Sequence, residues 1–329
     1  MMEKEDRLEF CFPQLINISC RKPTSHWSDR VLLNVVLGII CIFTVVLNLL
    51  VIISISHFRQ LHTPTNLLLL SLAVSDFLVG LLVWPGEIYK RTSCWILGGV
   101  LCSMWLFLAV TVMCASVGNM VLISADRYVA ICDPLHYNTK VTVKRVQLCV
   151  CLCWFFSLLL CSIILKGDLT HPGKANSCYG ECVLGIDYEG GIVDLVMVFI
   201  LPLGIIVTLY TRVFVVAVSQ ARAMRSHVTS VKLQHPVSVR AKTSELKAAR
   251  TLGVLVLVFI VCLSPIYIVS FAGDNQMSAF AKNAIYLYYF NSCLNPLIYV
   301  LFYPWFRRAV RLVVTLHILQ PGSWGDNIL

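Results

Sequence analysis

Charged residues are scarce in this chain of 329 residues: Asp, Glu, Lys and Arg make up 13% of it, whereas 58% of its residues are hydrophobic. A soluble domain usually carries about 25% charged residues, so this composition excludes a soluble globule. Histidine is also rare, with eight residues, and none of them lies within the long apolar runs. A histidine-based catalytic or metal site inside a membrane is therefore excluded. An internal repeat and a low-complexity segment are absent as well.

Long apolar runs dominate the sequence instead. A helix needs about 20 apolar residues to cross about 30 Å of hydrocarbon. Seven runs meet this length, namely 31–56, 65–86, 96–125, 146–165, 190–211, 251–273 and 283–306. They predict an all-α membrane protein with a bundle of seven transmembrane helices. We expect an N-terminal tail at 1–30, the transmembrane domain at 31–303, and a short membrane-surface helix and tail at 304–329. No apolar leader precedes the first run, so no cleavable signal peptide is expected.

The distribution of basic residues predicts the orientation of the bundle. With the N-terminus outside, sixteen of the 26 Lys and Arg residues fall on the inner side, as the positive-inside rule requires. The net charge of +9 then reflects topology and not nucleic-acid binding. The positive-inside bias alone can explain the basic loop 212–250. Contact of this loop with anionic lipid or an acidic partner is the alternative explanation. The sequon that begins at Asn17 lies on the outer side, where N-glycosylation takes place.

Six of the 15 cysteines fall on the outer side, where an oxidising environment permits disulfides. They are Cys11, Cys20, Cys94, Cys102, Cys178 and Cys182. Six cysteines allow many connectivities, and the sequence alone does not choose among them. The other nine cysteines lie in the spans or at their inner ends, where we expect reduced packing residues.

One acidic residue lies in the middle of the second apolar run. An ionisable group inside a span is costly and suggests a function, and this group is Asp76. Asn48, Ser116, Asn291 and Asn295 are expected to face it from other runs. Oxygen ligands suit a hard cation, so this set is a candidate sodium site. A water-filled polar network is the alternative, and the two are compatible.

The fifth, sixth and seventh runs contain Pro202, Pro265 and Pro296, and Asp126-Arg127-Tyr128 stands at the inner end of the third run. Each proline is expected to bend its helix. The chain resembles the rhodopsin-like (class A) G-protein-coupled receptors along essentially its whole length. The residues that carry the resemblance are Asn48, Leu72-Ala73-Val74-Ser75-Asp76, Asp126-Arg127-Tyr128, Trp154, Pro202, Phe259, Cys262, Pro265 and Asn295-Pro296-Leu297-Ile298-Tyr299.

Within that class the chain resembles the trace amine-associated receptors. The set that matches the seventh-span fingerprint of that family is Asn291, Ser292, Asn295, Pro296, Tyr299, Tyr303, Trp305 and Phe306. The resemblance implies a Cys102–Cys182 disulfide and a Cys20–Cys178 disulfide. It assigns no partner to Cys11 or Cys94.

The resemblance also implies a receptor in the plasma membrane that signals to a heterotrimeric G protein, of the stimulatory Gs/Golf type, in olfactory neurons. Arg127 is expected to pair with Asp126 and Glu245 at rest, and Tyr210 and Tyr299 to hold Arg127 in the active state. The class usually has Trp after Cys262, where this chain has Leu263. Either Phe259 or Tyr267 then carries the signal toward Pro265.

Aminergic receptors hold the ligand ammonium on a third-span aspartate, and Ala109 stands at the corresponding position here. The fifth span supplies another acid, Asp194, eight residues before Pro202 and thus about 12 Å toward the outside. The resemblance is closest to fish members that carry the acid at this position. Asp194 is therefore the predicted ammonium site, and stabilisation of a helix N-terminus is the alternative.

Further ligand contacts follow from counting along the other spans. In addition to Ala109, they are Val110, Met113, Ile266, Tyr267 and Tyr289. The aromatic residues among them either attract an ammonium or serve as simple packing. Glu87, near the outer end of the second span, is either a weaker cation contact or a solvated helix end.

Other classes fit less well. An opsin needs a lysine at the position of Tyr289, and a transporter usually shows repeats or several intramembrane charges. An enzyme needs a nucleophile with its base, or metal ligands. A monoamine neurotransmitter receptor or another class A odorant receptor is the main alternative within the receptors. The sequence does not name the amine.

Overall fold

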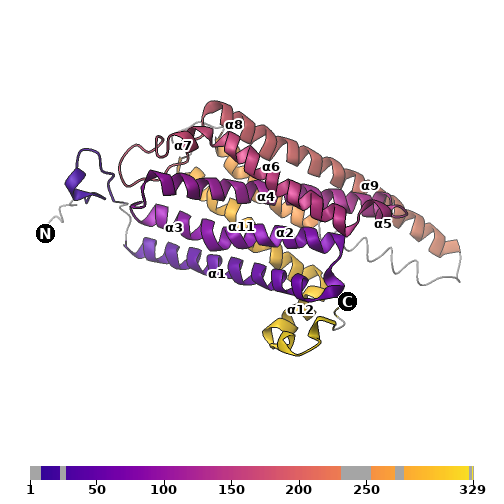
Figure 1. Cartoon of the computed structure of the whole chain (residues 1–329). Coiled ribbons are helices and arrows are strands. Elements are labelled where there is room, and N and C mark those ends of the chain that lie inside the picture. The colour runs from indigo at the N-terminus through magenta and orange to yellow at the C-terminus, as the bar shows by residue number, and fades with distance from the viewer. Residues whose placement is uncertain (1–8, 23–26, 231–252, 271–277, 326–327, 329) are drawn as a thin grey trace.

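The computed structural model describes residues 9–22, 27–230, 253–270, 278–325 and 328. Seven helices in this part are long and apolar enough to cross a membrane, which confirms the predicted seven-helix bundle. Figure 1 shows them running along one common axis, with the N-terminal segment at one end and α12 at the other. Glu245 lies outside the described residues.

Two of the seven spans contain an interruption, and the other five are continuous helices over the described residues. The first is α1 (Trp27–His57), the third α4 (Gly98–Cys132) and the fourth α6 (Val143–Ile164). The second consists of α2 (Pro64–Leu78), η3 (Val79–Val83) and α3 (Trp84–Thr92). The fifth consists of α8 (Tyr188–Asp194), η4 (Leu195–Ile200) and α9 (Leu201–Ser230). The sixth spans Gly253–Ser270, and the seventh is α11 (Ser278–Phe302).

Short helices connect or follow the spans. They are η1 (Pro13–Leu15), η2 (Arg59–Leu61), α5 (Tyr137–Lys140), α7 (Lys166–Thr170), α12 (Pro304–Val314), η6 (His317–Leu319) and η7 (Ser323–Gly325). In α12 the apolar residues Trp305, Phe306 and Ala309 are buried, and the arginines Arg307 and Arg308 face outward. This two-sided helix is the expected one after the seventh span.

Two threonines fix the beginnings of helices at the inner side of the bundle. The Thr63 hydroxyl accepts a hydrogen bond from the Asn66 backbone N–H, with Pro64 at the first helical position. The Thr142 hydroxyl accepts one from the Arg145 backbone N–H. Such caps satisfy an otherwise unpaired donor, so both helices begin where the sequence places a hydroxyl.

The two interruptions η3 and η4 are π-helical turns, and each is followed two residues later by a proline, Pro85 and Pro202. Proline supplies no N–H to the preceding turn, and a wider turn absorbs the change. Such turns rotate the helix beyond them and often lie at functional sites. Asp194 directly precedes η4, so the turn sets the direction of its side chain.

The second and third spans form the centre of the bundle. They are buried over most of their length, whereas the first, fourth and fifth spans expose much apolar surface. Ile42, Phe156 and Phe214 are among the exposed side chains, as expected of positions that face lipid. A hydrogen bond of 3.1 Å from the Trp154 indole N–H to the Ser71 hydroxyl joins the fourth span to the second.

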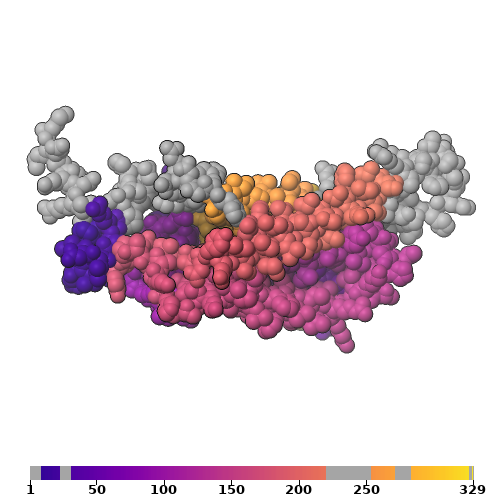
Figure 2. Space-filling view, turned by 90° about the horizontal axis from the view of Figure 1, so that it is seen from above, coloured from indigo at the N-terminus to yellow at the C-terminus, as the bar shows by residue number. Residues whose placement is uncertain are grey.

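The N-terminal segment 9–22 and the loop 171–187 form a cap over the outer end. The Cys20 N–H donates to the Tyr179 carbonyl at 2.8 Å, and the Tyr179 N–H donates to the Ile18 carbonyl at 2.7 Å. In Figure 2 the N-terminal segment, in indigo, lies against this loop at one end of the molecule. Asn17 is exposed on the cap, so its side chain is accessible to glycosylation.

Three disulfides hold this outer cap. Cys102–Cys182 joins α4 to the loop, and Cys20–Cys178 joins the N-terminal segment to the same loop. Both are the pairings that the resemblance implied. The third disulfide joins Cys11 to Cys94. These are the two outer cysteines to which the resemblance assigned no partner. Gly180 permits it: its φ is +107°, and a Cβ there would lie 2.8 Å from the Cβ of Cys11.

The Cys11–Cys94 disulfide predicts a specific mutational pattern. Cys11→Ser and Cys94→Ser should each lower the melting temperature of the purified protein, because loss of a native disulfide typically costs about 2–5 kcal/mol in small domains. The double variant should melt no lower than the less stable of the two single variants, because the single and the double variants all lose the same one bond. Cys149→Ser, at an exposed free cysteine, is the control. Additive losses in the double variant would contradict the pairing.

Candidate functional site

A cavity of about 540 Å³ lies at the outer end of the bundle. Its walls come from α4, from α8 and η4, from the sixth span and from α11, and the loop residues Leu184, Ile186 and Asp187 border it. Most of the lining side chains are apolar or aromatic. Concave sites of this size with few polar groups are typical of small-molecule binding.

Seven of the eight residues predicted to contact a ligand line this cavity. They are Ala109, Val110, Met113, Asp194, Ile266, Tyr267 and Tyr289. Counting from the prolines and from the third-span arginine therefore placed them at one depth, although they come from four different spans. Ala109 is 4% exposed, and all the third-span residues in the cavity wall are uncharged.

Asp194 is the last residue of α8 and is partly buried in the cavity wall. The Tyr267 side chain lies beside its carboxylate, and the Tyr267 ring stacks on Phe199 with centroids 4.4 Å apart. The acid in the first turn of α8 is Glu189. Stabilisation of a helix N-terminus is therefore the wrong interpretation for Asp194, since it lies at the other end of the helix.

Glu87 is not part of the cavity wall. Its side chain is 1% exposed, and it forms ion pairs with Lys90 at 2.9 Å and with Arg91 at 2.5 Å. The interpretation of Glu87 as a solvated helix end is wrong, because its own helix supplies two cations that cover the carboxylate. A direct contact with a ligand would require these ion pairs to open.

Several lining residues were missed by the sequence reasoning. They are Lys90, Cys114, Asp187 and Tyr288, among others. Asp187 directly precedes α8 with an extended backbone, so helical periodicity did not place it. Lys90 follows Glu87 by three residues on the helix that was expected to approach the ligand. The sulfur atoms of Cys114 and Cys161 lie 3.3 Å apart. The position of Cys114 therefore depends on how α4 packs against α6.

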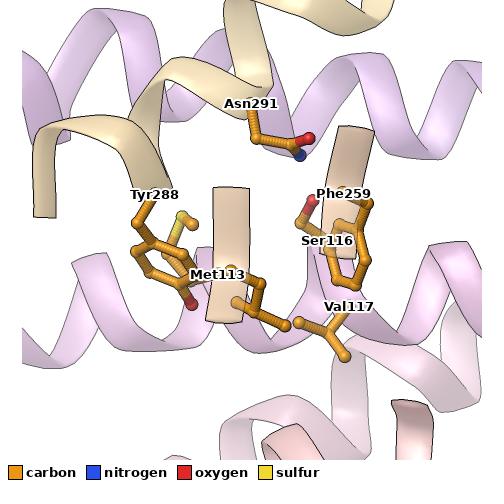
Figure 3. A pocket seen from close by; sticks show the side chains of 7 residues that line it. Met113, Ser116, Val117, Phe259, Tyr288 and Asn291 are labelled. Carbon is orange, nitrogen blue, oxygen red and sulfur yellow. The ribbon is translucent and has the colours of Figure 1, made fainter. Parts of the chain in front are cut away.

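A second, narrow crevice lies below the cavity. Figure 3 shows Met113, Ser116 and Val117 of α4 facing Phe259 of the sixth span, with Tyr288 and Asn291 of α11 beside them. Leu263, at the position where the class has Trp, completes the lining. The crevice has no room for a water-sized group. Met113 and Tyr288 line both spaces, so they connect the cavity wall to Phe259.

A buried polar network lies deeper in the bundle. The Asn295 side chain donates to Asp76 Oδ2 at 2.7 Å, and the Asn48 side chain donates to the Ser292 carbonyl at 2.9 Å. Among the described residues, Asp76 Oδ1, Asn48 Oδ1, Asn291 Oδ1 and Asn295 Oδ1 are buried without a hydrogen-bond partner. Buried polar atoms without partners are rare. These oxygens therefore fit either ordered waters or a hard cation.

Arg127 at the inner end of α4 is held by its neighbour. Its guanidinium donates to Asp126 Oδ2, with the Nε contact at 3.0 Å, and to the Thr65 hydroxyl. Tyr137 donates to Asp126 Oδ1 at 2.8 Å. Burial, and then the nearby Asp126 charge, raise the pKa of Tyr137, so the phenol keeps the proton it donates. Thr65 and Tyr137 were not expected from the sequence.

The other residues predicted at this end lie close by. Tyr128 packs against Ile131 and Val213. The hydroxyls of Tyr210 and Tyr299 are buried and have no hydrogen-bond partner among the described residues. Pro265 and Pro296 lie within their spans.

In the second inner loop, Asp133 accepts hydrogen bonds from Lys140 at 2.8 Å and faces His136 at 2.7 Å. The Lys140 contact, followed by the His136 contact, lowers the pKa of Asp133 to about 2. Asp133 therefore stays negatively charged at physiological pH, beside the basic side chains of Lys140 and His136.

Comparison with known proteins agrees with this geometry. Residues 47–299 match the 7 transmembrane receptor (rhodopsin family). The chain belongs to the rhodopsin family of seven-transmembrane receptors. It is 34% identical to trace amine-associated receptor 13c of Danio rerio, over 99% of this chain and 98% of that protein. It is 36% identical to trace amine-associated receptor 9 of Mus musculus, over 98% of this chain and 96% of that protein.

Membership in this family has two consequences. The protein is a receptor and not an enzyme. Receptors of this family bind a ligand and couple to a G protein.

We propose that the polar network of this receptor binds Na⁺ through Asp76 with Ser116, Asn291 and Asn295, because the unpaired buried oxygens suit that ion. NaCl should then raise the melting temperature of the purified receptor above its value in choline chloride, as ligand binding to the folded state requires. Asp76→Asn should abolish this difference. A sodium effect of equal size in Asp76→Asn would contradict the site.

Proposed function

We propose that this receptor binds a small amine through Asp194 and signals to a stimulatory (Gs/Golf-type) G protein, at the plasma membrane of olfactory neurons, with its N-terminus outside. The observation that carries the proposal is the position of Asp194 in the wall of an otherwise mostly apolar cavity. A partly buried carboxylate in such surroundings favours an ionic partner, and an ammonium forms a charge-assisted hydrogen bond with it.

The surroundings of Asp194 fit an organic cation. Tyr267 lies beside the carboxylate, and Tyr288 and Tyr289 line the same cavity. Aromatic faces attract an ammonium by about 0.5–2 kcal/mol, depending on its desolvation. The apolar side chains Val110, Met113 and Ile266 provide contacts for the carbon skeleton. The ligand is thus an ammonium joined to an apolar body.

Similarity to receptors named for trace amines supports this proposal over the alternatives. A monoamine neurotransmitter receptor holds its ligand on the third-span acid, and Ala109 replaces that acid in the cavity wall. A different class A odorant receptor does not require an ammonium partner at all. A panel of biogenic amines with a cAMP readout discriminates among the three, because only the proposed function needs both an amine and Asp194.

The contacts at the inner end fit a resting receptor. Arg127 is closed onto Asp126, and the hydroxyls of Tyr210 and Tyr299 are unengaged. An agonist that binds better to the open form shifts the population toward it, by no more than this difference in affinity. The route is from the cavity through Met113 and Tyr288 to Phe259, since these side chains line the crevice together.

Asp194→Asn is the sharpest test of the ligand site. The change keeps the side-chain size and removes the charge. A hydrogen bond to a charged group contributes about 1.5–3 kcal/mol, so agonist potency should fall at least about tenfold. Glu189→Gln, an equal charge change at an exposed position of α8, should leave the dose–response curve unchanged. An unaltered response of Asp194→Asn to amines would overturn the proposal.

The inner end generates a second prediction. Arg127→Ala should reduce G-protein coupling while the affinity for a labelled amine stays measurable, because Arg127 is remote from the cavity.

Glu245→Ala should raise basal cAMP if Glu245 holds Arg127 at rest. Lower basal cAMP in Glu245→Ala would show that Glu245 does not stabilise the resting state.

A further inference from the structure

Charges of both signs line the outer cavity. Asp187 and Asp194 contribute two carboxylates, and Lys90 contributes an ammonium. The Lys90 side chain is 23% exposed, so it is accessible from the cavity. A site that binds only cations has no use for a fixed ammonium in its wall, because like charges repel.

The two signs lie on different walls. Lys90 belongs to α3, which packs against α1 and η3. Asp187 directly precedes α8 and Asp194 ends it, and α8 packs against α6. Figure 1 shows α3 and α8 on opposite sides of α4. A ligand in the cavity therefore meets carboxylates on one side and an ammonium on the other.

Among the described residues, the cations on the α3 side outnumber the carboxylates that pair with them. One carboxylate, Glu87, is shared by two cations, Lys90 and Arg91, which leaves one net positive charge. Arg91 lies over the Tyr286 ring at 4.7 Å and is not in the cavity wall. Lys90 lies over the Trp105 ring at 5.4 Å. Lys90 is thus the member of the group that faces the cavity.

We propose that the ligand is an amine that also carries an anionic group, a carboxylate in the first instance, and that Lys90 binds this group while Asp194 binds the ammonium. This inference rests on the proposed function, because it takes the ammonium at Asp194 as given. Glu87 is then a positioning residue that holds Lys90 in place, and the receptor discriminates against diamines, whose second ammonium meets Lys90.

The first test uses the wild-type receptor and three matched series of probes. Linear ω-amino acids from glycine to ε-aminocaproate are compared with alkylamines and with diamines of equal carbon number, in a cAMP assay and by ligand-induced thermal shift of the purified receptor. At the chain length that gives the highest potency, the amino acid should be at least about tenfold more potent than the diamine. The carboxylate of the amino acid gains a charged contact with Lys90, whereas the second ammonium of the diamine is repelled by it. Equal or higher potency of the diamines at every length would overturn the inference.

The second test uses variants at Lys90. Lys90→Gln should weaken the amino acid at least about tenfold and leave the alkylamine within about twofold, and it should improve the diamine. Lys90→Arg keeps the charge and should retain the order of the wild type. Lys174→Gln, at an exposed loop lysine outside the cavity wall, is the control. An equal loss for all three probes in Lys90→Gln would show that Lys90 only supports Glu87.

The outcomes separate this inference from the proposed function. Responses to alkylamines that depend on Asp194 but are indifferent to a carboxylate would overturn the role of Lys90 alone. Amine responses that are independent of Asp194 would overturn the proposed function. If Lys90→Gln does not reach the cell surface, the wild-type series and Lys90→Arg still decide the matter, because both keep the ion pair with Glu87.

Discussion

A carboxylate in an apolar wall within a membrane protein is the interaction on which the account of this receptor depends. Water solvates such a group poorly, so its charge is costly unless a cation lies beside it. At Glu87 the protein supplies the cations itself, from the same helix. At Asp194 the side chain that hydrogen-bonds the carboxylate is the neutral Tyr267, and we propose that the ligand supplies the cation. This difference between two acids at similar depth distinguishes a structural ion pair from a binding site.

The remaining architecture keeps Asp194 in place. The π-helical turn η4 follows Asp194 directly, and α9 beyond it packs against α4. The outer cap, with its three disulfides, fixes the loop that borders the cavity. Below the cavity the packing is tight, and Met113 and Tyr288 connect it to Phe259. In the proposed function, a ligand that shifts these side chains acts on the sixth span.

The sequence predicted much of this arrangement, for physical reasons. Hydrocarbon thickness sets the length of a span, so the seven helices followed from the apolar runs. Seven of the predicted cavity residues followed from the resemblance to class A receptors together with the helical rise, which sets the depth of each residue. Lateral neighbours did not follow from counting. The partners of Arg127 include Thr65 from α2 and Tyr137 from α5, and the burial of Glu87 depends on the rotamers of Lys90 and Arg91. The Cys11–Cys94 pair was open because several connectivities satisfy the same spacing.

The central claim is that the ligand ammonium rests on Asp194, and the structure of the agonist-bound receptor in complex with its G protein tests it most directly. The account predicts the amine nitrogen at about 2.7–2.9 Å from an Asp194 carboxylate oxygen, the range of charge-assisted hydrogen bonds, with Glu87 still paired to Lys90 and Arg91. An amine nitrogen bound to Glu87, or at any site that leaves Asp194 without contact to the ligand, would contradict it.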